Sequence, residues 1–243
     1  MSTFQMSGST QIRPLGFSTG CLYKFMDSYS PEALDLLASQ GLEAIEVMCT
    51  PIDKLNRLPD IIPLVKKFAV KSLHLPLKTK FRSDTVSREI LLQLEEFYVE
   101  IGASLVVVHP EAVEDWKVFD FLAMHFAIEN LDNRKPRWFN FEQFELFFDQ
   151  HPDWQMVLDL NHCATYGDLE ERADRYAGRF GDRIAEIHLS GCADNLGHCP
   201  LYEKDQKEIV ACLAGTSCPI IIESPFDDAS GFEKEIAYIK QHQ

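Results

Sequence analysis

Nine ionisable side chains occupy similar places in the sequence: each stands at the end of a short apolar run or a few residues beyond it. Seven stand near the C-terminal ends of such runs, namely Glu46, His74, His109, Glu129, Asp159, His188 and Glu223. His162 and His198 follow within the reach of a loop. Imidazoles and carboxylates gathered in one place would be costly to bury without a cation to compensate them. Because the set offers nitrogen and oxygen donors and no thiolate, it predicts a site for Zn²⁺, Mn²⁺, Co²⁺ or Fe²⁺.

Each of these residues, taken singly, has a simpler interpretation. A lone histidine in a strand is commonly a hydrogen-bonded packing residue, and a lone Asp or Glu after a strand commonly caps the next helix. The other histidines, His125, His151 and His242, do not follow the strand-end pattern. The metal interpretation therefore depends on whether the fold brings the ends of the strands together.

Eight short apolar runs alternate with stretches of helical character. The runs span residues 15–20, 42–47, 70–75, 104–109, 125–130, 155–160, 184–189 and 219–224. Ser30, Pro31 and Gly41 mark the start and the end of one intervening helix. Residues 83–102 and 168–181 show the apolar spacing of two further helices. Strict alternation predicts a parallel sheet, and eight such units in this length fit a closed (β/α)8 barrel of the α/β class.

An open doubly wound sheet is the alternative fold. It is disfavoured because no G-x-G-x-x-G motif or phosphate-binding loop follows an early apolar run. We expect one barrel domain over residues 14–243, preceded by a loose polar lead-in over residues 1–13. In such a barrel the carboxyl ends of all the strands converge on one mouth, where active sites lie. All nine ionisable residues are therefore expected at that mouth.

Composition limits the classes of partner. Lys and Arg number 23 and Asp and Glu number 38, so the formal net charge is −15. A negative field of this size disfavours binding to nucleic acid. The sequence has no apolar run of about 18 residues, no recognisable secretion signal and no C-x-x-C pair among its seven cysteines. We therefore expect a cytoplasmic protein with reduced thiols and no membrane contact, and self-association is left open.

Two loops expected at the mouth are basic, although the chain as a whole is acidic. They span residues 77–82 and 133–138 and contain Lys78, Lys80, Arg82, Arg134, Lys135 and Arg137. Such loops are either simply solvated or form a site for a phosphate or carboxylate group of a substrate. On the second interpretation, Lys78 and Arg134 are candidate substrate-binding residues.

Six strand-end motifs in this order resemble those of the xylose isomerase-like TIM barrel superfamily. They read LHLPL, VVVHPE, AIENLD, VLDLNH, EIHLSG and IIIESP. The superfamily contains sugar isomerases and epimerases as well as endonuclease IV. For the isomerases and epimerases, the resemblance implies one divalent ion held by Glu129, Asp159, His188 and Glu223, with His162 completing the D-x-x-H motif.

For endonuclease IV, the resemblance implies a larger set of ligands around three zinc ions. The histidines of the third and fourth strands match His74 and His109, and a histidine in a late loop matches His198. One ligand departs from the pattern, because Leu196 stands where an aspartate is expected. Asp194, two positions earlier, is a candidate replacement.

Three interpretations follow from this resemblance: two are reaction classes, and the third is a barrel without catalysis. The favoured one is an isomerase or epimerase of a small sugar, polyol or sugar-phosphate-like substrate. In it Glu129 and Glu223 transfer protons around a metal-stabilised enediolate, and Glu46 binds a substrate hydroxyl. The alternative is a multinuclear zinc phosphodiesterase, in which Glu129 bridges two ions. A barrel that only binds a metal or ligand is the third. One ion is expected in the first case, and two or three in the second.

Overall fold

The strands of this computed structural model form a closed parallel barrel, and the structure describes residues 13–135 and 140–243. The order around the barrel is β1-β10-β7-β6-β5-β4-β3-β2. The strands are β1 (Leu15–Ser18), β2 (Ala44–Met48), β3 (Val70–His74), β4 (Leu105–Val108), β5 (Phe126–Glu129), β6 (Gln155–Asp159), β7 (Ile184–Leu189) and β10 (Ile220–Ile222). Seven of the predicted apolar runs contain one of these strands each, and the run over residues 42–47 overlaps β2, which extends one residue further to Met48. The predicted (β/α)8 fold is confirmed.

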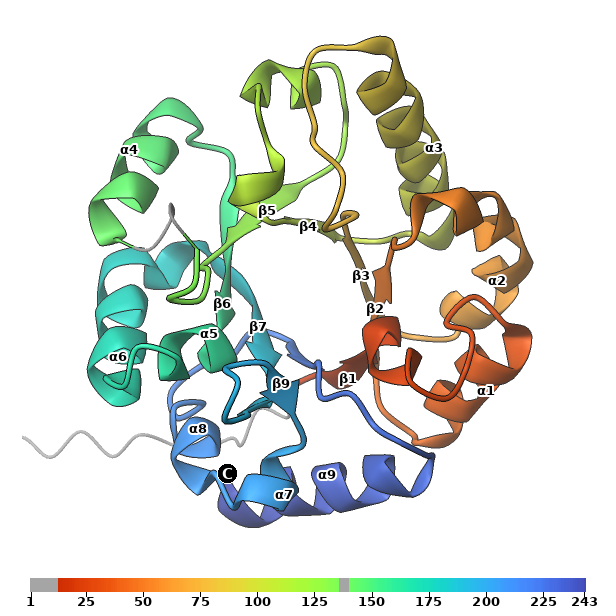
Figure 1. The fold of residues 1–243 in the computed structure, drawn as a ribbon. Helices are drawn as coiled ribbons and strands as arrows, with labels where there is room; N and C mark the ends of the chain where they lie inside the picture. Colours follow the sequence, from red (N-terminus) through yellow and green to blue (C-terminus); the bar gives the residue numbers. More distant parts are fainter. Residues whose placement is uncertain (1–12, 136–139) are drawn as a thin grey trace, which may run out of the picture.

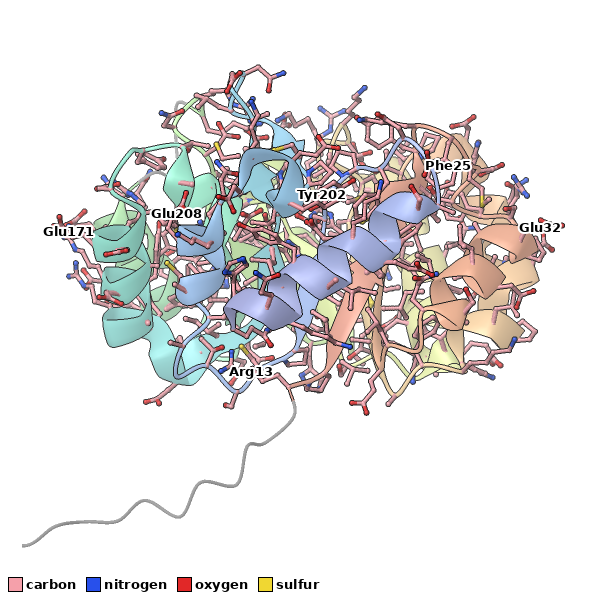
Figure 2. All side chains as sticks on the ribbon, turned by 90° about the horizontal axis from the view of Figure 1, so that it is seen from below. Arg13, Phe25, Glu32, Glu171, Tyr202 and Glu208 are labelled. Carbon is pink, nitrogen blue, oxygen red and sulfur yellow. The ribbon has the colours of Figure 1, made fainter. Side chains whose placement is uncertain are left out.

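Helices surround the strands as an outer ring (Figure 1). They are α1 (Pro31–Ser39), α2 (Leu58–Val65), α3 (Thr85–Ile101), α4 (Phe141–Gln150), α5 (Leu160–Ala164), α6 (Leu169–Phe180), α7 (Leu201–Lys204), α8 (Lys207–Ala211) and α9 (Ser230–His242). The side view in Figure 2 shows α9 lying obliquely across the outside of the barrel, with Arg13 toward one end and Phe25 toward the other. Within the described part of the chain, no helix has both the length and the apolar character that crossing a membrane requires.

Local sequence signals explain where the helices begin and end. The hydroxyl of Ser30 accepts a hydrogen bond from the Ala33 N–H, so it caps α1 as its position before Pro31 predicts. Asp84 caps α3 in the same way, and Gly102 ends that helix in the left-handed conformation at φ 66°. The predicted lead-in falls outside the described residues apart from Arg13, which bonds the Leu213 carbonyl.

Side chains alternate between the two faces of the barrel wall. One large apolar cluster fills the space between the strands and the helices, and it includes Val106, Val108, Ile128 and Leu158. Inside the barrel lies a smaller cluster of Leu105, Val107, Ala127 and Val157. The strand positions that follow on this inner face are polar, because the alternation brings His109, Glu129 and Asp159 next in line. The fold thus supports a polar mouth on an apolar floor.

A short hairpin after β7 was not predicted from the sequence. It pairs β8 (Gly191–Cys192) with β9 (His198–Cys199), and Figure 1 shows it above the mouth between α5 and α7. Glu235 of α9, which is fully buried, accepts hydrogen bonds from the Leu201 N–H and the Ser224 hydroxyl. This carboxylate therefore ties α7, which follows the hairpin, to the loop after β10.

Candidate metal centre

The donors predicted at the strand ends come together in several groups, and three of these contain Glu129, Asp159 or both. In each group the potential ligand atoms lie within 4.8 Å of one another. These three groups are His74, His109 and Glu129; Glu129, Asp159, His188 and Glu223; and Asp159, His162 and His198. They include all eight residues that the sequence predicts as metal ligands. Glu129 and Asp159 each belong to two of these three groups, and a fourth group joins His74 and Glu223 to Glu46.

Glu129 lies at the centre of the site, and its two oxygens face different groups. Oε2 is 2.9 Å from Nε2 of His109 and 3.3 Å from Nε2 of His74. Oε1 is 3.3 Å from Nδ1 of His162 and 3.6 Å from Nδ1 of His188. Only about 1% of the side chain is exposed. A carboxylate in this position can serve two cations at once.

The two oxygens of Asp159 also have different surroundings. Its Oδ1 accepts a hydrogen bond from the His162 N–H at 2.9 Å, which caps α5, as the simpler interpretation of an acid after a strand predicts. Its Oδ2 is buried without a hydrogen-bond partner and lies 3.4 Å from Nδ1 of His162. The second oxygen is therefore available to the group that contains His162 and His198.

The polar atoms left without partners test whether the site suits a divalent cation. Among the described residues, the buried side-chain atoms that lack a hydrogen-bond partner include Asp159 Oδ2, His188 Nδ1 and both oxygens of Glu46. Buried polar groups are nearly always paired, so the unpartnered atoms of Asp159 and His188, which share a donor group with Glu129 and Glu223, fit a cation held by that group. The described donor groups contain no cysteine, and all seven cysteines are free thiols outside them. Imidazole and carboxylate donors suit Zn²⁺, Mn²⁺, Co²⁺ or Fe²⁺.

Without a cation, His74 and His162 hold protons at neutral pH. Burial by itself would lower the pKa of His74, but the charges of Glu46 and Glu129 outweigh burial and raise it to about 9. The pKa of His162 rises in the same way to about 10, against burial, through Asp159 and Glu129. Burial would raise the pKa of Glu223, but His188 and His198 lower it to about 2. Glu223 is therefore ionised at neutral pH, and the negative charge around the centre draws protons onto His74 and His162.

A cavity of about 460 Å³ opens above these donors. It is lined by the donors His74, His109, Glu129, His162, His198 and Glu223. Its other lining residues are neutral, among them Ser18, Tyr23, Ser28 and Thr50. Among the described residues that line the cavity, none is Lys or Arg. The cavity is thus lined by imidazoles and carboxylates of the donor groups and by neutral residues, and its size suits a small molecule.

Comparison with solved structures identifies the architecture. Endonuclease IV from Thermus thermophilus is 16% identical, with a TM-score of 0.68 over 94% of this chain and 99% of that one. D-allulose 3-epimerase from Methylomonas sp., in complex with D-allulose, is 15% identical, with a TM-score of 0.67 over 95% and 97%. 3-Keto-D-glucoside 4-epimerase from E. coli is 11% identical, with a TM-score of 0.64 over 95% and 100%. The chain has the xylose isomerase-like barrel fold. No family model and no curated protein sequence matches it.

Enzymes predominate among these neighbours of xylose isomerase-like fold, but the fold alone does not choose between their activities. At this level of identity the comparisons support the architecture predicted from the six motifs. The reaction has to be argued from the site itself.

The three substrate-binding residues predicted from the sequence lie outside the cavity lining. Glu46 is completely buried beneath the floor, with Oε2 at 3.2 Å from Nε2 of His188. Arg134 is held by Asp132, with 2.8 Å between Nε and Oδ1, and it also donates to the Asn195 carbonyl. Lys78 is exposed to solvent.

Other cations of the two basic loops also have partners outside the cavity. Lys135 bonds Glu111 at 2.6 Å, and Arg82 bonds Asp84 at 2.6 Å. Arg137 lies outside the described residues. The described parts of these loops thus resemble solvated, internally paired segments more than an anion site.

Asp194 does not replace the aspartate that is missing at Leu196. Its side chain is 94% exposed and bonds Nζ of Lys204 at 3.0 Å, away from the donor groups. Leu196 itself adopts a positive φ of 62° in the turn of the hairpin. Asp159 is the carboxylate that reaches His162 and His198.

Sequence reasoning missed Glu186, a second acid buried inside the barrel. It belongs to a further group with Glu46 and His188, and only 2% of it is exposed. It was missed because it stands in the middle of β7, whereas the predicted residues stand near the ends of strands. The signal was present, since Glu186 and His188 are two residues apart in a strand and therefore share a face.

Proposed function

We propose that this protein is a metal-dependent phosphoester hydrolase that uses two or more divalent ions on a small-molecule substrate. The observation that carries the proposal is the division of the two Glu129 oxygens between separate donor groups. A single ion held by Glu129, Asp159, His188 and Glu223 would leave four imidazoles at the mouth without a role. A second ion would use His74 and His109, and a third would use His162 and His198.

The residues present fit such ions as follows. His74 and His109 would hold one ion with Glu129; Asp159, His188 and Glu223 would hold a second with the same Glu129; and His162 and His198 would hold a third with Asp159. When bound, such ions lower the pKa of water and stabilise negative charge on phosphoryl oxygens. Glu129 and Asp159, shared between groups, would fix the spacing of the positive charges.

Glu223 is the more exposed of the two donor carboxylates that line the cavity. Its side chain is 11% exposed and lines the cavity, whereas that of Glu129 is 1% exposed. Its pKa is lowered to about 2, because His188 and His198 outweigh the effect of burial. It is therefore ionised at neutral pH and a weak base, so it would hold a cation and orient a water molecule at the cavity.

Charge and size favour a small substrate over duplex DNA. Binding a duplex requires many cationic contacts along its phosphates. The chain carries a net charge of −15, and no described residue lining the cavity is Lys or Arg. The cavity of about 460 Å³ has the size of a site for a small organic molecule. A sugar phosphodiester or sugar phosphate fits both constraints.

A sugar isomerase or epimerase remains the second candidate function. The observation that favours it is that two carboxylates, Glu129 and Glu223, line the same cavity and could carry protons on and off a bound sugar. The similarity in fold to a D-allulose 3-epimerase is compatible with it. This reaction needs only the four-donor group.

Metal content and reaction type together test the proposal. The protein should be stripped with a chelator, reloaded with Zn²⁺ or Mn²⁺ and analysed for bound metal. We expect two or three equivalents per chain, with hydrolysis of bis(p-nitrophenyl) phosphate or of small sugar phosphodiesters. An abasic oligonucleotide should be a poorer substrate. One equivalent, together with deuterium exchange from D₂O into a ketose and no hydrolysis, would select the epimerase instead.

A matched pair of variants sharpens this test. His109→Asn removes a donor of the first group and leaves the four-donor group complete. A hydrolase should then lose one equivalent of metal and at least about a hundredfold in kcat, since the second ion stabilises the transition state. An epimerase should keep its proton exchange. His125→Asn, at an exposed histidine before β5, is the control and should change neither.

A further inference from the structure

The two nitrogens of His188 face opposite surroundings. Nδ1 points to the metal centre, at 3.3 Å from Oε2 of Glu223 and 3.6 Å from Oε1 of Glu129. Nε2 points into the barrel, at 3.3 Å from Oε1 of Glu186 and 3.2 Å from Oε2 of Glu46. The ring is completely buried, so water cannot stabilise an alternative orientation.

Glu186 and Glu46 contact Nε2 differently. Oε1 of Glu186 has the geometry of a hydrogen bond with His188 Nε2, and the same oxygen accepts the hydroxyl of Ser72 at 3.1 Å. Neither oxygen of Glu46 has a hydrogen-bond partner among the described residues, although the side chain is fully buried. Glu186 therefore orients the His188 ring through a hydrogen bond and adds a negative charge, whereas Glu46 adds a negative charge alone.

We propose that Glu186 is a positioning residue, which accepts the Nε2 proton of His188 and thereby fixes Nδ1 as the ring nitrogen available to a metal ion. A neutral imidazole carries one N–H. If the proton were on Nδ1, the lone pair of Nε2 would face two buried carboxylates, and the N–H would point at the metal position. The carboxylates below the ring exclude that tautomer. This inference rests on the proposed metal centre but not on the reaction that it catalyses.

The strand geometry makes this arrangement stable. Glu186 and His188 stand two residues apart on the inner face of β7, and Ser72 lies on the inner face of β3. Glu186 is not among the residues that line the cavity, so it cannot act on a substrate directly. Its effect has to pass through His188. Partners of this kind commonly raise the basicity of a ligand and hold its ring in place.

Nitrogen NMR of the zinc-loaded protein, labelled at histidine, reads the tautomer directly. In the wild-type protein we expect His188 to carry its proton on Nε2 and to show the nitrogen shift of a metal-bound Nδ1. His188→Asn identifies the signals. Glu186→Ala should lower zinc affinity by about 10–100-fold, measured by competition with a chromogenic chelator. It should also speed exchange of the Nε2 proton or give mixed tautomers.

Two further variants separate orientation from charge and from packing. Glu46→Gln removes a negative charge next to Nε2 of His188 but leaves Glu186, the acceptor of the Nε2 proton, in place. It should therefore weaken zinc binding and leave the tautomer unchanged. Ser72→Ala removes the other hydrogen bond to Glu186 and should affect zinc affinity less than Glu186→Ala does. Glu186→Gln keeps the size and one acceptor oxygen, and it serves if the alanine variant does not fold.

The outcomes distinguish this inference from the proposed function. A wild-type protein that binds no metal would refute the metal centre as a whole. A wild-type protein that binds zinc through Nε2 of His188 would refute the role of Glu186. So would folded Glu186 variants that lose thermal stability in the metal-free form but keep the wild-type zinc affinity and spectrum, since that result indicates packing alone.

Discussion

Replacing Glu129 by Gln should weaken two metal positions at once. Oε2 serves the group with His74 and His109, and Oε1 serves the group with His188. A glutamine keeps the shape of the side chain but removes the negative charge and turns one oxygen into an N–H donor. Each position then loses an anionic ligand. Removal of an outer partner already costs about 10–100-fold in metal affinity, so a direct ligand should cost at least about a hundredfold.

The rise in Tm on adding zinc measures how much metal affinity the variant loses. With free zinc at about a hundred times the dissociation constant, each filled position stabilises the fold by about 2.7 kcal/mol, and two contribute about 5.4 kcal/mol. For a chain of this size about 1 kcal/mol corresponds to about 2–4 °C, so zinc should raise the wild-type Tm by about 11–22 °C. A hundredfold weaker variant retains about 0.4 kcal/mol per position and a rise of about 2–3 °C.

The assay is calorimetry or fluorimetry of the stripped protein against added zinc, with bound metal measured on the same samples. Glu235→Gln is the matched control, because Glu235 is also a buried glutamate but belongs to none of the donor groups. It should bind zinc like the wild-type protein. If Glu129→Gln keeps two equivalents of zinc and the full rise in Tm, the bridging role of Glu129 is refuted.

Three further predictions follow from other parts of the structure. Gly16→Ala should destabilise the barrel by about 1–3 kcal/mol or more, measured by urea unfolding, because an added Cβ would lie 2.0 Å from the Ala44 carbonyl oxygen. A variant as stable as the wild-type protein would contradict this close packing. In the metal-free protein the pKa values of His74 and His162, about 9 and about 10, keep both protonated at pH 7. Zinc must displace these protons, so its affinity should rise with pH up to that range and calorimetry should detect proton release at pH 7; a flat pH dependence would contradict the shifts. Arg134→Ala should leave KM for a small phosphodiester nearly unchanged, and a rise of about tenfold or more would restore the anion-site interpretation.

The position of the site was predictable because topology determines it. Once eight apolar runs alternate with helices, a parallel barrel follows, and its carboxyl ends meet at one mouth. Residues as far apart in the sequence as His74 and Glu223 therefore had to be neighbours. Their contact with the same cavity depends on which strand they end and very little on the residues around them.

Which donor atom belongs to which group was not predictable in the same way. It depends on side-chain conformations and on the register between strands, neither of which the sequence pattern specifies. The split of Glu129 between two groups is an example, and so is the burial of Glu46 beneath His188 instead of in the cavity. The pairing of Arg134 with Asp132 was within reach of the sequence, because the two are only two residues apart in one loop.

The substitution at Leu196 shows why ligands cannot be counted from motifs one position at a time. Taken alone, a leucine in place of an expected aspartate suggests that His162 and His198 have lost their metal. In the structure, Asp159 uses one oxygen to cap α5, which leaves its other oxygen to serve the neighbouring histidines. That second oxygen is buried, has no hydrogen-bond partner and lies 3.4 Å from Nδ1 of His162, and one oxygen of Asp159 lies within 4.8 Å of a ring nitrogen of His198. A donor of one group can thus complete the next, so the loss of one carboxylate from the hairpin need not reduce the number of ions that the mouth can hold.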